Sequence, residues 1–158
     1  MFVTRRLLAV LTLAAALAAV LVAPAGAQDA SSPECTSATV LKPGNEVRTD
    51  DSDPVESRAF GAAFVHIKGT KLFFSVVIVN PARETFILGH IHPGAAGVNN
   101  PPIVTLFEGS SSNRLFVQAD VLEIGADTAA AICGDLAGHY VNYHTTQDPQ
   151  GAVRGQLR

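Results

Sequence analysis

The sequence predicts an all-β protein, an antiparallel β-sandwich with at most one short helix. Three observations indicate this fold class. Short runs rich in Val, Ile, Phe and Thr, about seven or eight of them, are separated by Gly, Pro, Asn and Asp, as is typical of strands joined by turns. Helical signals are confined to one short stretch, and no internal repeat is present. Together these features favour a sandwich of the immunoglobulin-like kind.

The first 27 residues have the features of a signal peptide. Arg5-Arg6 gives a positively charged start, residues 7–22 form an apolar run, and Ala25-Gly26-Ala27 supplies small residues for cleavage. The run of about 16 residues is short for a membrane span, and no stop-transfer charges follow it. We therefore expect cleavage after Ala27, no transmembrane span thereafter, and a secreted or cell-envelope location. The paired arginines leave twin-arginine export open as a route.

After cleavage, we expect residues 28–36 to form a mobile polar leader and residues 37–158 a single domain. The remaining chain, about 130 residues, is long enough for one hydrophobic core and too short for two. Loss of two arginines lowers the basic count from 11 to 9 against 14 acidic residues, so the net charge is near −5. The acidic residues are scattered, and nucleic acid is not an expected partner.

Cys35 and Cys133 are the two cysteines of the chain. An even number of cysteines in an exported chain, without the short spacing of a redox or zinc motif, predicts a disulfide. This bond would tie the start of the domain to a segment near its end. The chain-entropy model gives such a long loop a stabilisation of about 4–5 kcal/mol.

The first half of the domain contains four expected strands. Ser37–Leu41 is followed by a loop rich in Pro, Gly and Asp, which break periodicity. Ala59–Ile67 and Lys71–Asn80 flank Lys68-Gly69-Thr70, a hairpin signal. The second of these runs is almost wholly apolar and predicts a buried central strand. Thr85–His92 is the fourth strand.

The second half contains the remaining strands and the one expected helix. Ile103–Phe107 and Leu115–Gln118 are predicted strands on either side of a serine-rich polar turn. Asp127–Leu136 is the predicted helix, with its first residue as N-cap and a run of alanines inside it. His139–Thr146 and Ala152–Leu157 flank an Asp-Pro-Gln-Gly turn and predict a C-terminal hairpin.

Unusual residues gather around two histidines at the end of the fourth strand. Successive side chains in a strand alternate faces, so His90 and His92 project to the same side in a chelating arrangement. Pro93 cannot continue a strand ladder, and Gly94 and Gly97 tolerate positive φ. We therefore expect the histidine pair at the rim of the sheet, directly before a turn.

Three segments carry a resemblance to a known family: His90-Ile91-His92-Pro93-Gly94, the hairpin Tyr140–Leu157, and Asn45-Glu46-Val47. Together they resemble a CHRD domain, the module named from the extracellular antagonist chordin and also found in exported microbial proteins. The resemblance covers Thr39–Leu157. Two residues depart from it, Arg48 where a proline is usual and Gly89 where an alanine is usual. The family's microbial members have no established activity, so the resemblance implies a fold more than a function.

CHRD domains also show a weaker similarity to copper/zinc superoxide dismutases, which carry a His-x-His strand and a late strand histidine followed by a turn and an arginine. By this similarity His90, His92 and His144 stand at positions like three copper ligands. Arg154 resembles the arginine that guides the anion. The fourth copper ligand and the zinc loop have no counterpart, because no histidine lies between His92 and His139. The similarity implies a superoxide-dismutase-like sandwich.

The three histidines permit two interpretations. Neutral imidazoles are good ligands for copper or zinc, and three of them leave a coordination position open. Alternatively, they belong to a hydrogen-bonded cluster that fixes loops without metal, with Asn142 and Thr145 as the expected partners.

Three further residues have more ordinary interpretations. In a regular strand His144 shares a face with Tyr140 and Asn142, whereas His139 points to the opposite face, so His139 is not an expected ligand. His66 alternates with apolar residues in the first hairpin and is expected to be a strand histidine without a ligand role. Arg154 is expected to form a salt bridge or to bind backbone carbonyls, and its face relative to His144 depends on the length of the turn before it.

No nucleophile elbow, phosphate loop or paired-carboxylate motif is present, so the sequence gives hydrolase chemistry no support. The leading hypothesis is a non-catalytic exported binding or structural module that contacts an extracytoplasmic protein or small ligand through the loop Pro93–Pro102. The alternative is a copper- or zinc-binding protein with a site like that of superoxide dismutase. Whether the protein is an enzyme is left open by the sequence.

Overall fold

The computed structural model describes residues 32–48 and 55–158. The chain divides into two compact units, residues 1–30 and 31–158, and every described residue belongs to the second. The predicted signal peptide and the first residues of the predicted leader lie outside the described residues. Among the described residues, no helix is long and apolar enough to span a membrane.

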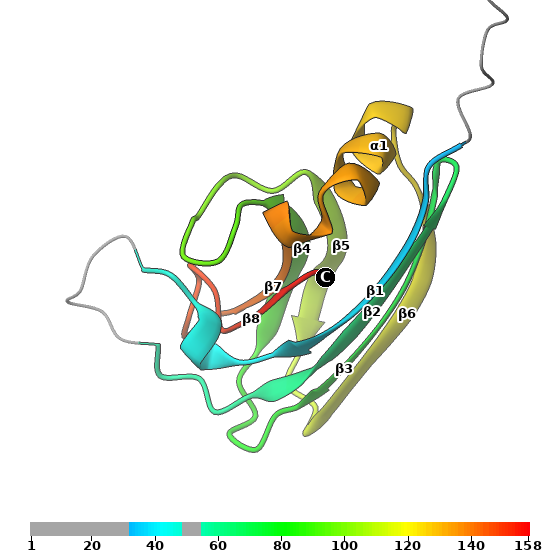
Figure 1. Cartoon of the computed structure of the whole chain (residues 1–158). Helices are drawn as coiled ribbons and strands as arrows, with labels where there is room; N and C mark the ends of the chain where they lie inside the picture. The colour runs from blue at the N-terminus through cyan, green and yellow to red at the C-terminus, as the bar shows by residue number, and fades with distance from the viewer. Residues whose placement is uncertain (1–31, 49–54) are drawn as a thin grey trace, which may run out of the picture. The chain divides into compact units, whose positions relative to one another are not determined.

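The described residues form eight strands, one α-helix and two short 3-10 helices (Figure 1). They are β1 (Glu34–Leu41), η1 (Pro43–Asn45), β2 (Phe60–Lys68), β3 (Lys71–Val79), β4 (Phe86–Pro93), β5 (Val104–Ser111), β6 (Leu115–Glu123), α1 (Ala126–Gly134), η2 (Leu136–Gly138), β7 (His139–Thr145) and β8 (Val153–Gln156).

The strands form two four-stranded sheets. The first sheet has the order β1-β2-β3-β6 and the second has the order β5-β4-β7-β8, and all neighbouring strands are antiparallel. The all-β antiparallel sandwich with one short helix is therefore confirmed. In Figure 1 the two sheets face each other, with α1 near one end of the space between them.

Alternation along the strands builds the core between the sheets. In β3, for example, every second residue from Leu72 to Ile78 is buried, while Phe73, Val77 and the other residues of the opposite parity are exposed. In the second sheet Ile91, Val141 and Val153 face inward and join the same core cluster. The apolar run in β3 is therefore central in its sheet, but the prediction that it is buried as a whole is wrong, because one face of this sheet is open.

Tyr143 links the two sheets at the centre of the core. Its hydroxyl donates to Oε1 of Gln118 on β6 at 2.9 Å, and its ring lies edge-on to Phe86 and Phe116. Gly89, its cross-strand neighbour on β4, makes room for this ring, since a Cβ at Gly89 would lie 2.5 Å from Cε1 of Tyr143. The absence of a side chain at residue 89 is therefore a packing requirement.

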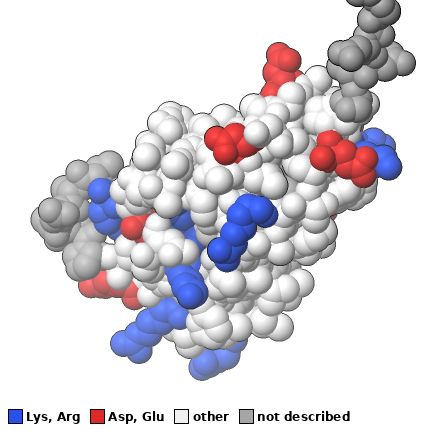
Figure 2. Space-filling model, in the orientation of Figure 1, with Lys and Arg blue, Asp and Glu red and all other residues white. Residues whose placement is uncertain are grey.

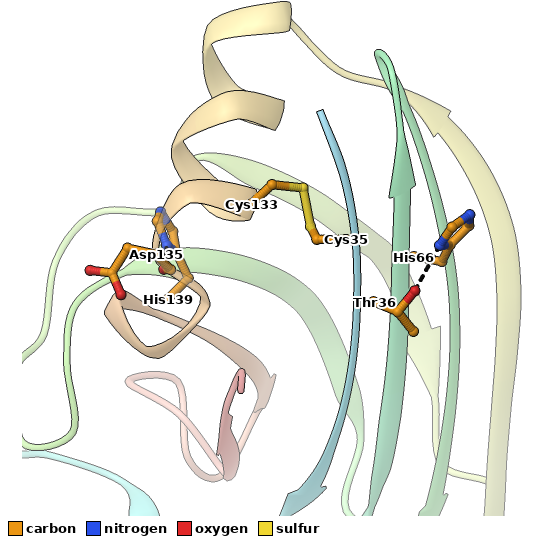
Figure 3. Close-up of a disulfide and its surroundings, with 6 residues drawn as sticks. All are labelled: Cys35, Thr36, His66, Cys133, Asp135 and His139. Carbon is orange, nitrogen blue, oxygen red and sulfur yellow. Dashed lines mark hydrogen bonds between the residues drawn. A yellow bond between two sulfur atoms is a disulfide. The ribbon is translucent and has the colours of Figure 1, made fainter. Parts of the chain in front are cut away.

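The predicted disulfide between Cys35 and Cys133 is confirmed (Figure 3). It joins β1 to α1 across 98 residues of sequence. In β1, Cys35 pairs with Ile67 of β2 in a regular ladder. Strand β1 thus begins at Glu34, so the end of the predicted leader, residues 34–36, belongs to the sheet.

The helix and one hairpin differ from the sequence-based expectation. Helix α1 begins at Ala126, so Asp127 lies in its first turn and is not the N-cap; Gly125 occupies that position without a side-chain hydrogen bond. Strand β6 extends to Glu123 because its antiparallel pairing with β3 continues to Lys71. Strand β5 likewise extends to Ser111, through residues predicted as a polar turn. The lengths of β5 and β6 are therefore set by strand pairing more than by local composition.

Candidate metal-binding site

A layer of polar and aromatic side chains covers the outer face of the second sheet. The register sets Leu88 opposite His144, His90 opposite Asn142, and His92 opposite Tyr140, and it sets Asn142 opposite Arg154 on β8. Cross-strand partners share a face, so these side chains lie together on the face away from the core. The polar and aromatic ones are His90, His92, Tyr140, Asn142, His144 and Arg154.

These side chains are buried although they lie on the outer face. His90, His92 and His144 are only 6–8% exposed. Three loops meet over them: the segment 42–48, the segment 94–103 after β4, and the turn 146–152 between β7 and β8, which lie close together in Figure 1. The histidines therefore lie beneath loops on the outer face of the sheet, and His92 directly precedes the end of β4 at Pro93, as expected.

The structure brings His90, His92 and His144 into one cluster. One ring nitrogen from each lies within 4.8 Å of the others, and Nδ1 of His90 lies 3.2 Å from Nε2 of His144. Two nitrogens bound tetrahedrally to one zinc ion at 2.0–2.1 Å lie about 3.3 Å apart. The His90–His144 pair already has this spacing, whereas the widest pair would have to close by about 1.5 Å.

Backbone carbonyls fix the protonation of two of the rings. Nδ1 of His92 donates to the Asn100 carbonyl at 2.8 Å, and Nδ1 of His144 donates to the Pro149 carbonyl at 3.0 Å. A carbonyl oxygen only accepts, so Nδ1 carries the proton and Nε2 of each neutral ring has a free lone pair. An N–H of a metal-bound histidine commonly donates in this way to a carbonyl in the second shell of a metal site.

The surroundings keep the rings neutral. Burial, together with the neighbouring His90 and His92, lowers the pKa of His144 to about 4, despite the opposing hydrogen bond to Pro149. Burial also lowers the pKa values of His90 and His92. All three rings are therefore neutral near pH 7, which is the form that binds metal.

Nε2 of His92 is a buried nitrogen, and no hydrogen-bond partner for it is found among the described residues. A surface pocket of about 260 Å³ lies against this ring and is lined by His92, Asn99, Asn100, Tyr140, Asn142 and Gln150. Buried polar atoms are normally paired, so an unpaired nitrogen beside a pocket fits a site that takes a small ligand. Three imidazole donors suit copper or zinc.

Arg154 shares the face of His144 but does not point into the cluster. Its guanidinium is 1% exposed and donates to Oδ1 of Asn99 at 2.8 Å and to the carbonyls of Ala95 and Val98 at 3.1 and 3.0 Å. It therefore binds the loop after β4 from below, as a carbonyl-binding residue.

Comparison with known families decides the classification. Residues 37–157 match the CHRD domain model, which covers nearly all of the described chain. The chain belongs to the CHRD domain family. A search of curated proteins and of solved structures found no significant match.

Both departures from the usual CHRD pattern have a structural role. The Arg48 guanidinium pairs with the Asp148 carboxylate, and both side chains are largely buried, so this pair connects the loop 42–48 to the turn between β7 and β8. Gly89 makes room for Tyr143, as described above. Neither residue contacts the histidine cluster through a hydrogen bond or ion pair among the described contacts.

The other candidate residues of this CHRD domain lie around the cluster, and no hydrogen bond between them and the histidine rings is found among the described residues. Asn142 donates to Oε2 of Glu46, and the Thr145 hydroxyl accepts from the backbone N–H of Asp148, so neither is the expected hydrogen-bond partner of the histidines. Gly94 and Gly97 have φ values of 141° and 85° and shape the loop that covers the site.

The two remaining histidines lie elsewhere. His139 binds the Asp135 carbonyl through Nδ1 beside the disulfide-linked helix (Figure 3). His66 lies within hydrogen-bonding distance of the Thr36 hydroxyl on the outer face of the first sheet. Neither belongs to the histidine cluster.

Sequence reasoning gave no role to two residues at this site, Tyr140 on the outer face of the sheet and Glu46 in the loop 42–48. Tyr140 stacks on His92 with ring centroids 4.8 Å apart and planes 5° apart, and alternation alone placed it on the face of His144. Glu46 is half-buried in the loop 42–48, and desolvation of its carboxyl raises its pKa to about 8 against the opposing effects of Arg154 and Arg48. A loop carboxylate without periodic neighbours gives no sequence signal of burial.

Proposed function

We propose that this CHRD domain is an extracytoplasmic binding module that holds one copper or zinc ion on His90, His92 and His144. The presence of a CHRD domain and of a disulfide supports an extracellular setting. The proposed export signal is the segment 1–27, with cleavage after Ala27.

The observation that carries the metal proposal is the pair of carbonyl contacts. Asn100 and Pro149 hold the Nδ1 protons of His92 and His144, so both Nε2 lone pairs are directed away from these carbonyls and are free to bind. Nε2 of His92 is buried and has no hydrogen-bond partner among the described residues, which supports its availability to a metal ion.

The residues around the cluster hold the ligands in position. Arg154 binds the carbonyls of Ala95 and Val98, and this same loop supplies the Asn100 carbonyl that orients His92. His90 would bind through Nδ1 with its ring proton on Nε2. When bound, copper would supply one-electron redox chemistry and zinc would not. With three histidine ligands and no zinc loop, the proposal is a metal-binding module and not a superoxide dismutase.

A second candidate function is a metal-free hydrogen-bonded cluster that supports recognition through the loop 93–102. The 3.2 Å contact between His90 and His144 favours it, because a proton on Nδ1 of His90 can be donated to Nε2 of His144. In this form the exposed residues of the covering loop, Ala95–Asn100, would contact an extracytoplasmic protein or small ligand.

Calorimetric titration with copper(II) and with zinc at neutral pH separates the two functions. Metal binding predicts one ion per chain for the wild type and an affinity lower by about 100-fold in His92→Ala and His144→Ala. His66→Ala is the matched control, since it removes an imidazole from the other sheet and should leave the affinity unchanged. Equal affinity in the wild type and both cluster variants would reject the site and leave the hydrogen-bonded cluster as the explanation.

A further inference from the structure

The outer face of the first sheet is exposed and apolar. Nine large apolar side chains on it are between 37% and 63% exposed. They are Val40, Phe60, Phe64, Phe73, Val77, Val79, Leu115, Val117 and Val121. No described helix or loop lies over this face in Figure 1, and uncharged surface runs along the corresponding lower right margin of Figure 2.

The register shows that these side chains form one continuous patch. Phe60 lies opposite Val79, and Val79 lies opposite Leu115. The next rows along the sheet pair Val77 with Val117 and Phe73 with Val121. No bulge interrupts the pairing within this sheet, so the patch is a regular four-stranded surface.

The size of the patch matches a protein interface. With whole side-chain areas of about 150–200 Å², the exposed fractions correspond to roughly 700 Å² of apolar surface. The largest apolar patch of a typical monomer is about 300–600 Å². A stable protein–protein contact buries about 800 Å² on each partner. The face is thus larger than a monomer needs and close to the footprint of one partner.

We propose that this face binds a second copy of the same chain, forming a two-fold symmetric dimer through the outer faces of the two first sheets. Flat apolar sheets stack face to face about 10 Å apart. The central row of the face has four residues, and three of them, Ala38, Ser75 and Ala119, have small side chains. Two such faces can therefore approach closely. A two-fold interface uses the same patch on both copies, so one apolar face is sufficient.

A lipid surface fits the face less well than a second copy. Membrane-bound faces combine apolar residues with a basic rim that meets anionic headgroups. At one end of this face the two lysines, Lys68 and Lys71, lie between Glu34 and Glu123, so the rim is mixed in charge. Mixed charges at the edge of an apolar centre are typical of a protein interface.

The test is the mass of the purified protein by sedimentation equilibrium over a concentration range up to about 100 μM. The proposal predicts a dimer for the wild type. Val117→Lys places a charge in the apolar face and should weaken the dimer by about 100-fold. Ile103→Lys is the matched control, because Ile103 is also an exposed apolar residue, at 41%, but lies outside this sheet. It should leave the dimer intact.

Circular dichroism and thermal unfolding of each variant establish that it is folded, and Val121→Lys replaces Val117→Lys if the latter is not. A monomeric wild type over the whole range, or a dimer unaffected by lysine in this face, would overturn the proposal.

Discussion

The guanidinium carbon of Arg154 lies 3.4 Å from the centre of the Tyr140 ring. Arg154 comes from β8, on one side of β7, and His92, which stacks on the same Tyr140, comes from β4 on the other side. The loop-binding arginine and a candidate metal ligand are thus connected through one aromatic ring. A change at Arg154 should therefore affect both the loop and the cluster.

Arg154→Met should lower the free energy of unfolding by about 3 kcal/mol, because two loop carbonyls lose their charged donor and Tyr140 loses a cation–π contact. It should also weaken metal affinity by about tenfold, since the Asn100 carbonyl that orients His92 lies in the released loop. Urea unfolding measures the first effect and hydrogen exchange over residues 94–102 reports the loop. Arg158→Met, at an exposed arginine, is the control. Unchanged exchange in the loop would contradict this role.

The histidine cluster should make the domain less stable in acid. The pKa of His144 is about 4 in the folded chain and about 6.5 when unfolded, so the unfolded chain binds more protons between these values. The free energy of unfolding should therefore fall as pH decreases from 6.5 to 4, by up to about 1.4 kcal/mol per pH unit for this group. Glu46 has the opposite effect on stability. Its pKa is raised to about 8 in the folded chain, so the folded chain binds more protons than the unfolded chain between pH 4.5 and 8, and the free energy of unfolding falls as pH rises over this range.

Variants separate these two opposing contributions. Urea unfolding between pH 4.5 and 8 gives the free energy of unfolding as a function of pH. On the acid side this free energy should change less with pH in His144→Gln than in wild type, and on the alkaline side it should change less in Glu46→Gln. His66→Ala should follow the wild type throughout, because His66 lies on the other sheet. An acid slope that is the same in wild type and His144→Gln would show that His144 is not buried in the neutral form.

Periodicity was sufficient to predict much of the fold and part of the site. Alternation placed His90 with His92, and His144 with Tyr140 and Asn142, because both strands are regular over these residues. The cysteine count and the export signal predicted the disulfide. These features depend on local geometry or on composition, which a single sequence contains.

The remaining features depend on contacts between distant segments. Burial of the cluster results from three loops that meet over the sheet, and nothing in the loop composition specifies that meeting. The face of Arg154 depends on the turn after β7, whose length was ambiguous. The full length of β6 depends on its partner β3 and not on its own mixed sequence. Alternation along the strands therefore predicted the histidine cluster better than it predicted the cluster's surroundings.

Gly89→Ala should destabilise the domain although alanine is the usual residue in the family. The added Cβ would lie 2.5–2.9 Å from three ring carbons of Tyr143, whose hydroxyl is held by Gln118. Overpacking of this kind costs about 1–3 kcal/mol. The control is Gly44→Ala, where an added Cβ has no atom within 4 Å. Thermal unfolding of both variants checks the prediction, and equal melting temperatures would contradict it.

Loss of the disulfide should be the largest single stability change of this set. The bond between Cys35 and Cys133 closes nearly the whole domain, and in the chain-entropy model its removal costs about 4–5 kcal/mol. Cys35→Ser with Cys133→Ser should therefore unfold at a much lower urea concentration than wild type, with a similar slope if the unfolded state is comparably exposed. Mass spectrometry after alkylation without reductant should detect no free thiol in wild type. Two alkylated cysteines in the native protein, or a double variant as stable as wild type, would show that this bond does not hold β1 to α1.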